Sequence, residues 1–153
     1  MADKEKSAEL ILKLYDLRRE ETMRKARDWY FTFNPDSVED IMATARGPQS
    51  AYYRMVVSYW EMACSFVNHG AIDAAMFADA NQEQTFVFAK VQPFIEEMRS
   101  MGQANYLKHL EQVVMSSPDA EARLVQMREM ARKMVAARAE AEAGQTHTDA
   151  ANA

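Results

Sequence analysis

The sequence predicts an all-α fold, a small bundle of about five to seven helices around one central apolar helix. Apolar residues recur at helical spacing, and no stretch combines alternating β-branched residues with a hairpin turn. The chain has only four glycines, each at a point where a helix is expected to end. We therefore expect one helical domain over residues 1–143, with long terminal helices, and a disordered polar tail over residues 144–153.

Composition narrows the class of protein. Hydrophobic residues make up 48% of the 153 residues and charged residues 27%, which is typical of a globular domain with a genuine core. The net charge of -5 argues against a protein that binds nucleic acid by neutralising phosphates. No apolar run resembles a secretory signal or is long enough to span a membrane, and the single cysteine fits a reducing compartment. The expectation is a cytoplasmic protein without a transmembrane segment or a specific nucleic-acid partner.

The central helix is predicted from Gln49 to His69, because aromatic, aliphatic and methionine residues cover nearly its whole circumference. A helix of this kind must be covered by other helices. Its polar residues follow one another at spacings of four and three, so they form one narrow stripe, namely Arg54, Ser58, Glu61, Ser65 and Asn68.

A long first helix is expected from Asp3 to Phe33, with a heavily charged middle. The basic residues from Arg18 to Arg27 could form an RNA patch, but acidic residues lie among them at pairing distance, which favours a salt-bridged surface. Pro35 then breaks the chain. Ser37 is placed to cap a short helix from Val38 to Arg46.

Three more helices are expected before the last one. Asp73 is placed to cap a brief helix that ends near Ala80. A helix from Glu83 to Met101 contains Pro93, which cannot donate a hydrogen bond, so the helix is either kinked or split there. A shorter helix follows from Ala104 to Met115.

The last helix is expected from Asp119 to Ala143, after a Ser-Pro start signal. Four of its residues lie at strict heptad spacing and form a candidate assembly face, namely Leu124, Met127, Ala131 and Met134. This face either packs on the bundle or pairs with a second copy as a homodimer. Two to three heptads are short for an isolated coiled coil, which favours packing.

Catalytic and metal-binding motifs are absent from the sequence. No histidine has a glutamate three residues before it, and no zinc, phosphate-loop or nucleophile-elbow pattern occurs. Cys64 lies among apolar residues, which favours a structural thiol over a nucleophile, and Trp60 is expected in the core. The sequence leaves three interpretations of Glu61 open. Its side chain could face solvent, pair with an arginine in a buried seam, or anchor a ligand. We expect no cofactor and no enzymatic activity.

Three short segments carry a resemblance to a known family: YWE at 59–61, HGAID at 69–73 and PFIEEMR at 93–99. Together they resemble a bacterial family of domains of unknown function, number forty-seven sixty, over roughly Tyr52 to Arg99. The family has no assigned activity and so brings no catalytic residues. The resemblance implies that Glu61 or Asp73 pairs with Arg99 inside the bundle. With two residues of the central stripe, this gives a candidate polar seam of Arg54, Ser58, Glu61, Asp73 and Arg99.

Three functions compete at this stage. The absent motifs, twelve methionines and heptad-spaced last helix favour a non-enzymatic helical module that binds another protein or itself. The second hypothesis is a small-molecule-binding or enzymatic bundle that uses Arg54 and Glu61, with Trp60 lining its pocket. The third is an RNA-associated or membrane-surface factor that uses Arg18 to Arg27, and the acidic net charge argues against it.

Overall fold

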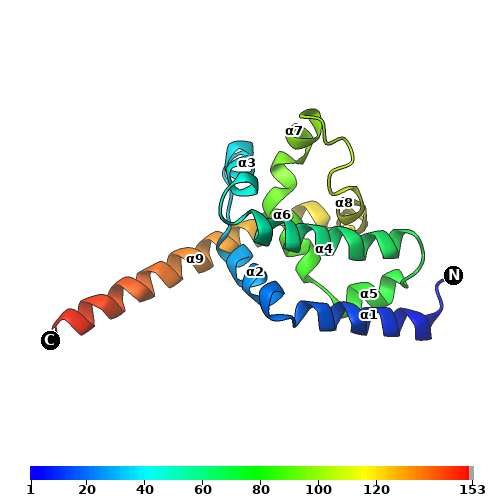
Figure 1. The fold of residues 1–153 in the computed structure, drawn as a ribbon, viewed down its shortest axis with the longest axis horizontal. Helices are drawn as coiled ribbons and strands as arrows, with labels where there is room; N and C mark the ends of the chain where they lie inside the picture. Colours follow the sequence, from blue (N-terminus) through cyan, green and yellow to red (C-terminus); the bar gives the residue numbers. More distant parts are fainter. Residues whose placement is uncertain (152–153) are drawn as a thin grey trace.

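The computed structural model describes residues 1–151, and every regular element among them is helical (Figure 1). The all-α class is therefore confirmed, with more helices than the five to seven expected. In chain order the elements are α1 (Lys4–Arg18), α2 (Glu21–Thr32), α3 (Val38–Arg46), α4 (Ser50–Asn68), α5 (Ala74–Ala80), α6 (Glu83–Val91), a 3-10 turn (Gln92–Phe94), α7 (Ile95–Ser100), α8 (Lys108–Met115) and α9 (Ala120–Ala151).

Two predicted helices are divided in the structure. The first ends at Arg18, and the Glu20 carboxylate accepts hydrogen bonds from the backbone N–H groups of Thr22 (3.0 Å) and Met23 (2.8 Å) to cap a new helix. Glutamate is not among the preferred N-cap residues, so the charged run looked continuous. The second division lies at Pro93, which sits in the 3-10 turn between α6 and α7. The helix at Pro93 is therefore split.

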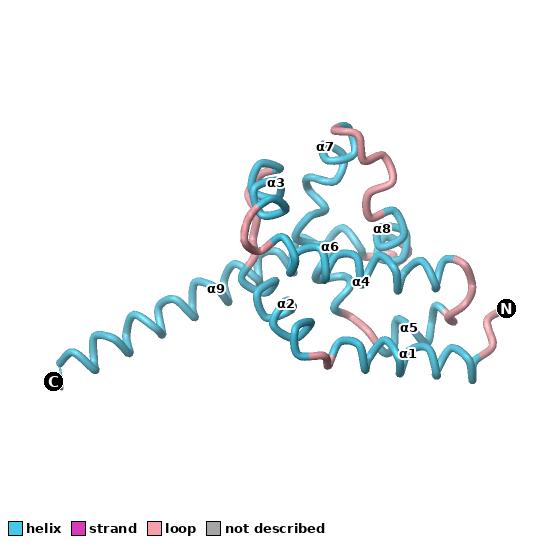
Figure 2. Tube along the Cα trace, viewed as in Figure 1, coloured by secondary structure: helices cyan, strands magenta, loops and turns pink. Residues whose placement is uncertain are grey.

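The helix α4 is the centre of the fold, as predicted, and its bounds differ from the expected ones by one residue at each end. It packs against α2, α3 and α8 and also contacts α5 and α6 (Figure 2). Its inward face is fully covered, and Trp60 has no exposed surface. The Tyr59 hydroxyl donates to the carbonyl of Leu14 at 2.6 Å, which fixes α1 against this helix.

The loop before α8 replaces the start of a predicted helix. The helix begins at Lys108 rather than near Ala104, because Gly102 and Leu107 both have left-handed backbone angles, with φ of 104° and 52°. This loop rises with α7 to one side of the body (Figure 2). A leucine rarely takes this conformation, so neighbouring contacts must hold the loop in place.

The long helix α9 is anchored at its start and projects at its end. Leu124 is fully buried, and the Arg128 guanidinium donates to the Ala89 carbonyl at the end of α6 (2.9 Å). Beyond Val135 the helix runs away from the body (Figure 1, orange to red), and its residues are exposed as far as His147. Disorder was expected from Gly144, but α9 continues through this position to Ala151; residues 152–153 lie outside the described part. No proline interrupts this stretch, and one glycine costs a helix only about 1 kcal/mol relative to alanine.

Within residues 1–151, no helix is both long enough and apolar enough to cross a membrane.

Candidate functional site

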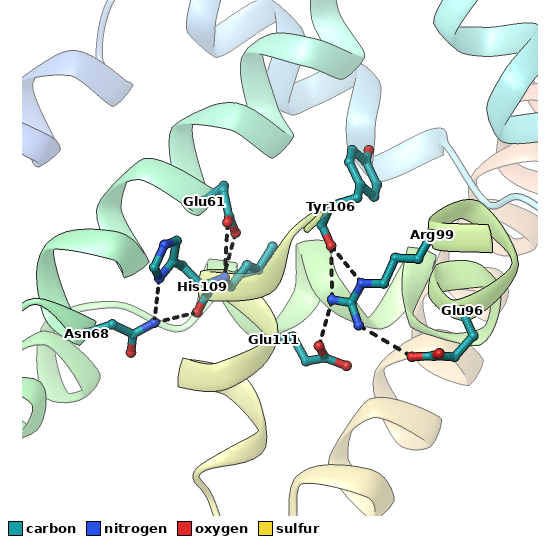
Figure 3. A network of polar contacts seen from close by, with 8 residues as sticks. Glu61, Asn68, Glu96, Arg99, Tyr106, His109 and Glu111 are labelled. Carbon is teal, nitrogen blue, oxygen red and sulfur yellow. Dashed lines mark hydrogen bonds and ion pairs between the residues drawn. The ribbon is translucent and has the colours of Figure 1, made fainter. Parts of the chain in front are cut away.

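Glu61 caps a helix that is distant in the sequence. One of its carboxylate oxygens accepts a hydrogen bond from the backbone N–H of His109 (3.0 Å), and the other accepts one from Leu110 (2.8 Å) (Figure 3). These N–H groups lie in the first turn of α8, whose own N-cap residue, Leu107, provides no side-chain cap. The positive end of the helix dipole also stabilises a carboxylate at this position. Glu61 therefore serves as a remote N-cap, a role outside the three interpretations considered from the sequence.

The end of the polar stripe holds the same helix. The Asn68 amide donates to the His109 carbonyl at 3.2 Å and lies 3.1 Å from its ring Nδ1 (Figure 3). The imidazole of His69 is 5.4 Å from that of His109, measured between ring centroids. Glu61 and Asn68, seven positions apart on the central helix α4, thus fix α8 against it.

Arg99 holds the loop between α7 and α8. Its guanidinium donates to the Tyr106 carbonyl from Nε (3.1 Å) and Nη2 (2.9 Å), and Nη2 also pairs with Glu111 at 2.7 Å (Figure 3). A longer contact of 3.4 Å reaches Glu96. The expected pairing of Arg99 with Glu61 or Asp73 is therefore wrong, since its acidic partners are Glu96 and Glu111 instead.

Asp73 lies apart from this network and caps α5, as expected from its position. Its carboxylate accepts a hydrogen bond from the N–H of Met76 at 2.9 Å. Its own backbone N–H donates to the buried hydroxyl of Ser7 on α1 at 2.9 Å. Asp73 thus joins α5 to α1, on a part of the fold distinct from the loop that Arg99 holds.

The remaining members of the polar seam line an open cleft of ≈ 990 Å³. Arg54, Ser58 and Glu61 form one side of this cleft, and α3, Met98 and the loop 102–107 form the others. Arg54 and Ser58 are exposed, and each donates one long hydrogen bond to a backbone carbonyl of α4, at 3.4 and 3.5 Å. Trp60 does not line the cleft, contrary to the expectation attached to the small-molecule hypothesis.

Two tyrosines are among the residues that line the cleft. The hydroxyls of Tyr53, on α4, and Tyr106, on the loop, are hydrogen-bonded to each other at 2.5 Å. Burial raises the pKa of both phenols above the ordinary value, so they remain protonated and neutral. Apolar side chains line the same cleft, among them Met42, Val57 and Leu107. Such a surface favours an apolar ligand over a highly charged one.

Cys64 is completely buried on α4. Burial raises the pKa of its thiol to about 12, and the nearby Glu61 carboxylate acts in the same direction. A protonated, inaccessible thiol is neither a nucleophile nor a metal ligand. Among the described residues, no group of three or more histidine, cysteine or acidic side chains is placed to hold a metal ion.

Arg18 and Arg27, at the two ends of the basic segment, take part in the protein's own packing, whereas Arg19, Arg24 and Lys25 are exposed. Arg27 forms a two-pronged ion pair with Glu83, through Nε (2.8 Å) and Nη2. The indole N–H of Trp60 also points to Glu83, at 3.4 Å, and the Arg18 guanidinium lies over the Trp60 ring at 5.3 Å. Arg18 and Arg27 therefore tie α1 and α2 to α4 and α6, and the engagement of these two residues weakens the hypothesis of an RNA-binding patch.

Lys90 is a buried cation that the sequence reasoning missed. It is 3% exposed, and its ammonium donates to the carbonyls of Tyr30 (2.6 Å) and Phe31 (3.0 Å) in the last turn of α2. The ring of Phe86 lies 4.5 Å from the Nζ atom. Burial lowers the pKa of this lysine to about 7. The available signal was a single lysine in the otherwise apolar segment FVFAKV.

The candidate assembly face is divided between the body and solvent. Leu124 is fully buried and Ala131 is 3% exposed, because α9 packs on α6, α2 and α8 through these residues. Met127 is half-buried against the same core. Met134 is 57% exposed. Most of the face therefore serves intramolecular packing, and only its last member is open to a partner.

These features define a small α-helical domain built around one buried helix, with a final helix that leaves the body. The chain belongs to the family described as domain of unknown function DUF4760, whose model matches residues 6–117. The match ends before α9 begins. No characterised protein and no solved structure matches the chain.

Proposed function

We propose that the protein is a non-enzymatic interaction module and that the projecting part of α9 is its contact surface. The observation that carries this proposal is the course of α9, which is fixed to the body by Leu124 and Arg128, is exposed from Ala136 to His147, and continues as a helix to Ala151. Met130 and Met134, both 57% exposed, lie where the helix leaves the body. Exposed methionines on a helix that no other helix covers are typical of adaptable protein-binding surfaces.

The proposal is tested with the full chain, the double variant Met130→Glu/Met134→Glu, and Met101→Glu as a control. Met101 is 53% exposed and follows α7, so it offers a similarly exposed methionine remote from α9 in the sequence. The partner is either a second copy of the chain or another protein that also binds in purified form. We expect the wild type and the control to retain this partner and the double variant to lose it. Retention by all three chains, or no partner for any of them, would refute the proposal.

Binding of a small amphiphilic molecule in the Arg54 cleft is the second candidate. The observation that favours it is the placement of three predicted seam residues along one cleft of ≈ 990 Å³ with apolar walls. A carboxylate-headed acyl chain would meet the exposed Arg54 with its head and Val57 and Met98 with its chain. Decanoate titrated against wild type and Arg54→Gln tests this, and equal affinity for the two chains would count against it.

A further inference from the structure

From Met130 onward α9 carries a second heptad stripe, which shares Met134 with the candidate assembly face and otherwise differs from it. Met130, Met134, Ala137 and Ala141 follow one another at spacings of four, three and four residues. Residues at these spacings share one side of a helix. All four are exposed, whereas the buried residues of α9, such as Leu124 and Ala131, lie on an adjacent face. We call these four residues the α9 seam.

From the α9 seam we infer that two copies of the chain associate through an antiparallel pair of α9 helices. The inference rests on the proposed interaction function and names its partner as a second copy. Two properties of the seam, the order of its side-chain sizes and the order of the charges beside it, both favour this arrangement over a parallel one.

Side-chain size is distributed along the seam in one direction. The two large residues, Met130 and Met134, come first, and the two small ones, Ala137 and Ala141, come last. In an antiparallel pair with its two-fold axis between residues 135 and 136, Met130 lies opposite Ala141 and Met134 lies opposite Ala137. Each large side chain then meets a small one, which gives close packing. A parallel pair would instead set methionine against methionine and leave the alanine layers underfilled.

The charges beside the seam are also ordered along the helix, with the positive residue before the negative one. Lys133 and Glu140 are seven residues apart, so they flank the seam on one side. In an antiparallel pair these equivalent sides meet, and Lys133 of one copy comes within reach of Glu140 of the other at both ends of the interface. This is charge complementarity of the chain with itself.

The body leaves room for the second helix. Met130 and Met134 are 57% exposed beside the body, and Phe31 of α2 is 43% exposed. A hollow of ≈ 180 Å³ lies next to the seam, lined in part by Phe31, Phe86 and Met134. A side chain from the second copy can fill this hollow, so the interface extends from the helix onto the body.

The first test is the mass of the full chain in solution. Light scattering should give twice the 17.5 kDa chain mass for the wild type and for Met101→Glu. Met134→Glu should raise the dissociation constant roughly 100-fold or more, because the charge is introduced twice in a symmetric interface. Circular dichroism establishes that each variant is folded. A wild-type chain that stays monomeric at millimolar concentration would overturn the inference; if it still retained an α9-dependent partner, the proposed function would stand without self-pairing.

Orientation is tested by disulfide formation between copies. Met130→Cys and Ala141→Cys should cross-link when mixed, since these positions face each other, but neither should cross-link alone. At 1.5 Å per residue the two thiols introduced at position 130 of an antiparallel pair would be separated by roughly 16 Å, too far for a disulfide. The buried Cys64 does not compete. Cross-linking of each variant with itself would instead show a parallel pair and reject the inference.

Charge reversal provides a test that leaves the seam itself intact. Lys133→Glu should weaken dimerisation by placing like charges across the interface, and Lys133→Glu/Glu140→Lys should restore the wild-type dissociation constant. Within one chain these two residues are seven positions apart and do not pair, so restoration reports a contact between copies. Equal affinity for all three chains would contradict the antiparallel register.

Discussion

Lys90 makes the free energy of unfolding depend on pH in a direction that can be worked out from the structure. Burial lowers the pKa of this lysine to about 7 in the folded chain, from an ordinary value of 10.5. Between these two values the unfolded chain binds a proton that the folded chain does not. Stability therefore rises with pH across this window and is lower near and below pH 7.

The size of the change in the free energy of unfolding follows from the width of the pH range that is measured. Each unit of pKa difference corresponds to 1.36 kcal/mol, so two pH units, from 7 to 9, give an upper limit of about 3 kcal/mol. The carbonyls of Tyr30 and Phe31, at the negative end of α2, and the Phe86 ring stabilise the ammonium and reduce this figure. Measurement stops at pH 9 because tyrosines, whose pKa values in the folded chain are raised by burial, act in the opposite direction above about pH 10.

The assay is urea unfolding of the wild type and of Lys90→Met at pH 7, 8 and 9. The wild-type midpoint should move upward by roughly 1 to 2 M across this range, given an m-value of 1–3 kcal/mol/M for a chain of this size. Lys90→Met lacks the titrating group and should lose most of that rise. Lys13→Met, at an exposed position of α1, is the matched control and should follow the wild type. Parallel pH profiles for the wild type and Lys90→Met would refute the reasoning.

Three further predictions concern the hydrogen bonds of Glu61 and Arg99 and the thiol of Cys64. Glu61→Ala removes both hydrogen bonds to the α8 N-terminus and should lower the free energy of unfolding by about 2 kcal/mol in urea titrations, whereas Ser58→Ala on the same helix should change it by less than about 0.5. Arg99→Ala leaves the Tyr106 carbonyl without its guanidinium donor and should cost about 1–2 kcal/mol and speed proteolysis in the loop 102–107; unchanged thermal stability would show that Arg99 is dispensable there. Cys64 should react with a thiol reagent only on unfolding, so labelling of the native chain at the rate of a free thiol would contradict its burial.

Local signals in the sequence predicted the elements that depend on neighbouring residues. The apolar circumference of α4 gave its bounds to within one residue, and Ser37 caps α3 as expected, accepting from the N–H of Asp40 at 3.2 Å. Asp73 caps α5 in the same way. Each of these depends on residues within one or two helical turns, where side-chain type and spacing determine the outcome.

Contacts between distant segments could not be predicted in this way. Glu61 finds its partners 48 and 49 residues further along the chain, and Lys90 finds the end of α2 59 and 60 residues earlier. The polar stripe showed that Glu61 lies on an otherwise apolar helix, but the identity of its partner depends on where α8 packs. Arg99 was assigned to the wrong carboxylates for the same reason, because its partners are set by the path of the loop 102–107.

The unbroken course of α9 has a mechanical consequence. Its first turns are fixed to α6 by Leu124 and Arg128, and the same backbone hydrogen-bond ladder continues through Val135 to Ala151. The projecting segment is therefore a semi-rigid arm whose direction is set by the body, unlike a flexible tether. A fluorophore at His147 would tumble with the whole molecule, and a domain fused directly after Ala151 would be held about 24 Å beyond Val135, at 1.5 Å per helical residue, in a defined orientation.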